Sequence, residues 1–68
     1  MNETMAEFYK NQLNFVGTAF SFDALVAGML YDASHNNGEV IQHDIFLELI
    51  FSDNSVAIID PENETIYT

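Results

Sequence analysis

The side chains in this sequence that could perform chemistry are mainly carboxylates. The chain of 68 residues has eleven aspartates and glutamates, two histidines and no cysteine. General acid–base catalysis needs such groups in a pocket that shifts their pKa, and so short a chain has little interior for a pocket. The sequence also has no glycine-rich phosphate loop and no Ser/His/Asp pattern. We therefore expect a protein that is not an enzyme, with no catalytic residue and no cofactor; an enzyme with a site between subunits ranks third.

Two groups of residues in the chain are potential metal ligands. His35 and His43 lie eight residues apart, without a third ligand at a suitable spacing. The segments 53–55 and 60–63 contain oxygen ligands, but neither has the central glycine and distal glutamate of a calcium loop. Turn formation explains both segments. We expect no metal site.

The balance of charge is strongly one-sided. The net charge is −10, and Lys10 is the sole basic residue besides the histidines. Free nucleic acid and anionic membranes are excluded as ligands, because almost nothing in the chain can neutralise phosphates. Folded domains usually intersperse both signs of charge. Carboxylates without counter-charges can therefore bind to a protein site that normally binds phosphates. The alternative is that they only keep a small apolar protein in solution.

The run Ile45–Phe51 is the strongest strand signal in the chain, because it is apolar, rich in β-branched and aromatic residues, and followed by turn formers. Side chains alternate between the two faces of a strand. The face predicted to point to the core consists of Ile45, Leu47, Leu49 and Phe51. The other face carries Phe46, Glu48 and Ile50, which is too apolar for a fully solvated surface.

Two helices are predicted before this strand. Thr4 and Glu7 have the spacing of a capping box, which opens a helix over 5–16 that Gly17 can close. Ser21 is placed to cap a second helix over 22–34. This helix is apolar nearly all round, so we expect it to be covered all round. Its face of small residues would let another backbone approach closely.

The remainder of the chain is predicted to form a sheet. Residues 39–44 are either the front of the first strand or a connector, and strands follow at 45–51, 56–59 and 65–68. The fold class is α+β: one domain over 1–68, with an N-terminal helical hairpin packed on a three-stranded antiparallel β-meander. The alternative is a short third helix capped by Asp44.

One set of residues is the candidate surface for binding a partner. Asp60, Glu62 and Glu64 form the densest acidic group, and Asp53 could join them if the loops of the sheet crowd together. Phe46 lies on the mixed face beside Glu48, where an aromatic anchor and steering charges would suit a basic partner. The full set is Asp44, Phe46, Glu48, Asp53, Asp60, Glu62 and Glu64.

In overall character the chain resembles the small acidic inhibitors that phages use against host defence and DNA-binding proteins. These include anti-CRISPR proteins, uracil-DNA glycosylase inhibitors and anti-restriction DNA mimics. The resemblance rests on the eleven carboxylates, the single Lys10, the short length and the order of helices before strands. It implies a protein that inhibits a nucleic-acid-binding protein by occupying its positively charged site. The alternative is a dimeric adaptor whose apolar surface binds a partner and whose charge gives solubility.

The hydrophobic content also bears on assembly and location. Hydrophobic residues make up 49% of a chain too short to bury them all, so we expect a homodimer. No apolar run approaches the roughly 20 residues of a membrane span. The N-terminus has no basic segment typical of a secretory signal. We therefore expect a cytoplasmic protein, in the host cytoplasm if the source is viral.

Overall fold

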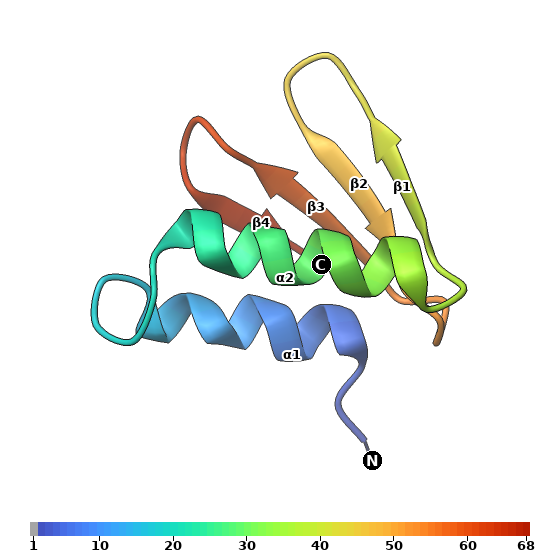
Figure 1. Ribbon diagram of the computed structural model, residues 1–68, viewed down its shortest axis with the longest axis horizontal. Helices are drawn as coiled ribbons and strands as arrows, with labels where there is room; N and C mark the ends of the chain where they lie inside the picture. Colours follow the sequence, from blue (N-terminus) through green and yellow to red (C-terminus); the bar gives the residue numbers. More distant parts are fainter. Residues whose placement is uncertain (1) are drawn as a thin grey trace.

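The computed structural model describes residues 2–68 and has two layers, with a pair of helices packed on one face of a sheet (Figure 1). The helical elements are α1 (Met5–Asn11), the 3-10 helix η1 (Gln12–Phe15) and α2 (Phe22–His35). The strands are β1 (Glu39–Gln42), β2 (Leu47–Ile50), β3 (Val56–Asp60) and β4 (Thr65–Tyr67). They form an antiparallel meander in the order β1-β2-β3-β4. The α+β class is confirmed.

The first helix begins as its sequence predicts. The Glu7 N–H donates to Thr4 Oγ1 at 3.1 Å, and the Thr4 N–H donates to Glu7 Oε1 at 2.9 Å, which completes the capping box. The α-helical geometry ends at Asn11 and continues as η1. Gly17 then adopts a φ of 90°, a left-handed conformation that ends the helical segment.

Helix α1 is fastened to the rest of the core by an aromatic residue. The Tyr9 ring stacks on Phe51, with centroids 5.3 Å apart, and its hydroxyl donates to Asp32 Oδ2 on α2 at 2.6 Å. Partial burial, followed by this hydrogen bond, raises the pKa of Tyr9 to about 12. The bond lets the ring pack inward while its polar end keeps a partner.

Helix α2 has one buried side and one bare side. The Ser21 hydroxyl caps it by accepting from the Ala24 N–H at 3.1 Å, as predicted. The buried side consists of Phe22, Leu25, Met29 and Ala33. The bare side consists of Ala24, Ala27, Gly28 and Tyr31, all exposed. The expectation that α2 is covered all round is therefore wrong for the single chain.

The sheet differs from the prediction in having four strands. Residues 39–42 form a strand of their own, with Val40 opposite Leu49 and Gln42 opposite Leu47. The run Ile45–Phe51 does not begin as a strand, because its first residues belong to the turn that joins β1 to β2. The His43 N–H closes this turn by donating to the Phe46 carbonyl at 2.9 Å. A third helix capped by Asp44 is excluded.

This turn changes the environment of one predicted core residue. Ile45 lies in the turn with 75% of its surface exposed, whereas Leu49 and Phe51 are buried and Leu47 is half-buried, as the alternation predicts. The core lies between the helices and the inner sheet face. The sheet contributes Leu49, Phe51, Ala57, Ile59 and Ile66 to it.

Candidate functional site

The two faces of the sheet have different surroundings. Helices α1 and α2 cover one face, and the register of the strands defines the residues on the other. Directly paired residues share a face, and neighbours along a strand do not. We call the uncovered side the helix-free face. It consists of Glu39, Ile41, Glu48, Ile50, Val56, Ile58, Asp60, Thr65 and Tyr67.

The helix-free face is apolar at its centre except for Glu48, which lies between Ile41 and Ile58. Ile41, Ile50 and Ile58 are only partly buried, and they are not among the residues packed against the core. Val56 and Tyr67 are 38% and 55% exposed. Single exposed hydrophobic residues are normal on a protein surface, but a contiguous group marks a site of interaction.

His43 organises the β1–β2 end of this face. Its Nε2 lies 2.8 Å from Glu48 Oε1, and its ring stacks on Phe46 with centroids 4.5 Å apart. Phe46 and Glu48, two of the predicted binding residues, are thus held on either side of one histidine. From the sequence, His43 was interpreted as a surface or partly buried residue without a ligand role. The proximity of His43 to Glu48 arises from the β1–β2 turn, which the sequence pattern did not predict.

The other acidic residues of this end lie around the β3–β4 turn. The Asp60 carboxylate accepts from Asn63 Nδ2 at 2.8 Å and from the Asn63 N–H at 3.3 Å. The side-chain hydrogen bond from Asn63 lowers the pKa of Asp60. Glu62 and Glu64 are exposed in the same turn, and Glu64 has a φ of 51°. Asp60 therefore shapes the turn, and the two glutamates project from it.

The topology brings these two turns together. In a meander, every second connection lies at the same end of the sheet, so the β1–β2 and β3–β4 turns are neighbours at the upper end of Figure 1. Asp44, Phe46, Asp60, Glu62 and Glu64 consequently gather at one end. The carboxylates of Asp44, Glu62 and Glu64 form no hydrogen bond within residues 2–68 that would occupy them.

Asp53 lies apart from the rest of the predicted set. It is in the β2–β3 loop, at the opposite end of the sheet (Figure 1). Its carboxylate accepts from the Met5 N–H at 2.8 Å, the Ser55 N–H at 3.0 Å and the Ser55 hydroxyl at 2.5 Å. These bonds, the Ser55 hydroxyl first, lower the pKa of Asp53. Asp53 joins the start of α1 to the sheet.

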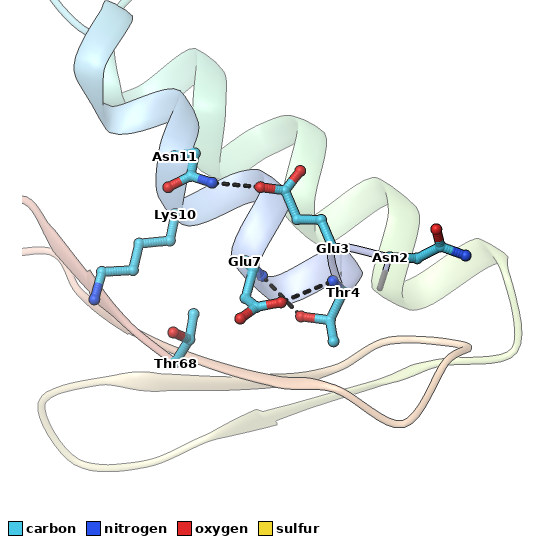
Figure 2. Close-up of a pocket in the computed structure, with 7 residues that line it drawn as sticks. All are labelled: Asn2, Glu3, Thr4, Glu7, Lys10, Asn11 and Thr68. Carbon is cyan, nitrogen blue, oxygen red and sulfur yellow. Dashed lines mark hydrogen bonds between the residues drawn. The ribbon is translucent and has the colours of Figure 1, made fainter.

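Lys10 lies on the helix side of the molecule. It lines a hollow with Glu3, Glu7, Asn11 and Thr68 (Figure 2). The Thr4 hydrogen bonds lower the pKa of Glu7 in this hollow, the backbone N–H contributing most. The helix-free face and its two turns thus contain no lysine or arginine. They carry the carboxylates of Glu39, Asp44, Glu48, Asp60, Glu62 and Glu64.

Neither a metal site nor a membrane-spanning helix is found in the part of the chain that the structure describes. Among residues 2–68, no three His, Asp or Glu side chains lie close enough together to hold a metal ion. Among the described residues, no helix combines the length and the apolar character that crossing a membrane requires. Comparison of the chain with protein-family models, characterised proteins and solved structures finds no match.

Proposed function

We propose that this protein is a non-catalytic inhibitor that binds a nucleic-acid-binding protein and occupies its positively charged site. The observation that carries the proposal is the helix-free face with its two turns, a largely apolar surface that carries six carboxylates and has no lysine or arginine on it. Other binding functions would not require so one-sided a border. A site that normally holds phosphates presents the opposite charge to it.

The two parts of this surface have different roles. The carboxylates at the β1–β2 and β3–β4 turns attract a basic partner over a distance and speed its association. The apolar centre supplies the buried contact area from which most binding energy comes. Phe46 stands between the two parts, and its stacking on His43 orders it before binding. An ordered side chain loses less entropy when the complex forms.

The predicted binding residues divide by their contacts. Asp44, Glu62 and Glu64 are exposed and available to replace phosphates. Phe46 and Glu48 contact the partner from positions that His43 fixes. Asp60 and Asp53 contribute indirectly, by holding the structure in place. Asp60 shapes the β3–β4 turn, and Asp53 anchors α1.

The test is competition with DNA. Purified restriction endonucleases, DNA glycosylases and CRISPR effector nucleases are incubated with the protein, and their binding to labelled DNA is measured over a salt series. At least one class should lose DNA binding, and the affinity of the inhibitor should fall as salt rises, because screening weakens opposite charges. An affinity that stays constant as salt rises would contradict phosphate mimicry.

Two matched double variants test which carboxylates are responsible for the inhibition. Glu62→Gln with Glu64→Gln should weaken inhibition about tenfold, since charges at the border of an interface set the association rate. Glu3→Gln with Asp23→Asn removes the same total charge from the helix side and should have little effect. Equal losses in the two double variants would show that net charge alone matters.

One observation favours a second candidate, an adaptor that binds through apolar contact. Ile50 and Ile58 are partly exposed at the centre of the helix-free face. If this area alone binds the partner, Ile50→Ser should abolish binding, while Glu62→Gln with Glu64→Gln should leave it intact. The opposite result favours the inhibitor.

A further inference from the structure

The turn between α2 and β1 contains an asparagine with an unoccupied side chain. Asn37 is exposed and has a φ of 60°, a left-handed conformation that asparagine tolerates. Its side-chain amide forms no hydrogen bond within residues 2–68, whereas Nδ2 of the neighbouring Asn36 donates to Asp32 Oδ1 at 2.8 Å. Asn37 is also the only asparagine in the sequence that precedes a glycine, Gly38. The side-chain carbonyl carbon of Asn37 is therefore open to attack.

The backbone nitrogen that follows Asn37 is free as well. Gly38 directly precedes β1, which is an edge strand of the sheet. The His43 N–H points to β2, where it donates to the Phe46 carbonyl, and successive N–H groups of a strand point to opposite sides. The alternation places the Glu39 N–H toward β2 and the Gly38 N–H toward the open edge. Within the described residues the Gly38 N–H donates no hydrogen bond, and no side chain of its own shields it.

Two other asparagines in turns share this setting only in part. Asn54 also has a positive φ, of 68°, but the N–H that follows it, that of Ser55, donates to an aspartate oxygen at 3.0 Å. The N–H that follows Asn63, that of Glu64, donates to a turn carbonyl at 3.4 Å. A nitrogen must give up such a bond before it can attack. Among the described turns, Asn37 alone combines a free side chain with a free following N–H.

We propose that Asn37 is a site of spontaneous deamidation, at which the chain forms a succinimide and then aspartate or isoaspartate. The Gly38 nitrogen gives its proton to a base in the solvent and forms a bond to Asn37 Cγ. The Cγ–Nδ2 bond breaks, and the nitrogen leaves as ammonia with a proton from the solvent. Water then opens the ring. Cleavage between the Gly38 nitrogen and Cγ gives aspartate, and cleavage between this nitrogen and the main-chain carbonyl carbon gives isoaspartate, so that overall one water is consumed for each ammonia released.

Both products disturb the junction between α2 and β1. In isoaspartate the main chain runs through Cβ and Cγ, which adds one methylene directly before Gly38. A Cβ atom at Gly38 would already collide with the Ile50 carbonyl oxygen and lie 2.6 Å from the Ala33 carbonyl oxygen, so the junction has little room for the extra length. Both products also add a carboxylate beside the C-terminus of α2, where the helix dipole disfavours negative charge. Deamidation should therefore limit the lifetime of the folded protein.

The test is incubation of the full chain at neutral and mildly alkaline pH, followed by peptide mapping with mass spectrometry and enzymatic labelling of isoaspartate. Asn37 should deamidate at least tenfold faster than Asn54 and Asn63. The rate should rise with pH, because the reacting nitrogen must lose its proton. Asn37→Gln should remove the modification, since the longer side chain would have to close a larger ring. The isoaspartate form, separated by ion exchange, should have a lower thermal unfolding midpoint than the unmodified chain.

Ser55→Gly is the matched variant that separates structure from sequence. It creates a second Asn-Gly step at Asn54, again at a positive φ, but with a following N–H that the Asp53 carboxylate holds. In this folded variant, checked by circular dichroism, Asn54 should deamidate several-fold more slowly than Asn37. In urea the two rates should become equal.

Two results would overturn the proposal. One is a wild type in which Asn37 deamidates no faster than Asn54 or Asn63, and the other is equal rates at the two Asn-Gly steps of folded Ser55→Gly. The reaction needs neither the helix-free face nor a partner. Deamidation can therefore fail or hold independently of the proposed inhibition.

Discussion

At the scale of single residues, the carboxylates of this protein have unequal roles. Asp53 accepts three hydrogen bonds that join the β2–β3 loop to the start of α1. Asp44 is exposed in the turn at the other end of the sheet. Both residues lie in connections between strands, and both were predicted to bind a partner. Only the three-dimensional structure reveals that the carboxylate of Asp53 is already occupied.

This difference predicts an effect on stability that depends on pH. Asp53→Ala should lower the thermal unfolding midpoint at neutral pH more than Asp44→Ala, although both remove one charge. The hydrogen bonds lower the pKa of Asp53 in the folded state, so its contribution is present above the unfolded pKa of about 4 and is lost as pH falls through the folded value. Midpoints measured from pH 7 into the acid range should show the gap between wild type and Asp53→Ala closing. A gap that is constant with pH would contradict this role.

At the scale of elements, the helix caps and the apolar run Ile45–Phe51 made much of the fold predictable. Both helix starts follow from local hydrogen bonds, at Thr4 with Glu7 and at Ser21, and such bonds depend on residues close in sequence. The β1–β2 turn has no such signal, since His43–Phe46 contains no glycine, proline or asparagine. Treating 39–51 as one strand would place Ile41 on the same face as Leu49, but the reversal places Ile41 on the helix-free face.

The junction between α2 and β1 gives a prediction at this scale. A Cβ atom at Gly38 would collide with the Ile50 carbonyl oxygen and lie 2.6 Å from the Ala33 carbonyl oxygen. Gly38→Ala should therefore reduce the free energy of unfolding by about 1–3 kcal/mol, as overpacking does elsewhere. Gly28→Ala is the matched control, because its Cβ meets open space and should cause no loss in the monomer. Denaturant unfolding at low protein concentration compares the two, and equal effects would contradict the tight junction.

At the scale of the whole molecule, topology decides which of the predicted site residues meet. Three strands have two connections, which lie at opposite ends of the sheet. The fourth strand adds a connection, and the β1–β2 turn then joins the β3–β4 turn at one end. Asp44 and Phe46 become neighbours of Glu62 and Glu64, and Asp53 is left at the other end. The charge of the site was evident from composition, but its location depended on a strand that the sequence left ambiguous.

The two sides of the molecule also differ in charge. The helices cover one face of the sheet and leave the other open, and their own outer side is also uncovered. One open surface is bordered by carboxylates, and the other has an uncharged lining.

The most direct test of the account is to map the contact surface by nuclear magnetic resonance. The isotope-labelled protein is titrated with the nucleic-acid-binding protein whose DNA binding it inhibits most strongly, and amide shift changes are recorded. The changes should gather on β1–β4 and on the β1–β2 and β3–β4 turns, with Phe46, Glu62 and Glu64 among the largest. Changes confined to α1 and α2, with the sheet unaffected, would contradict it.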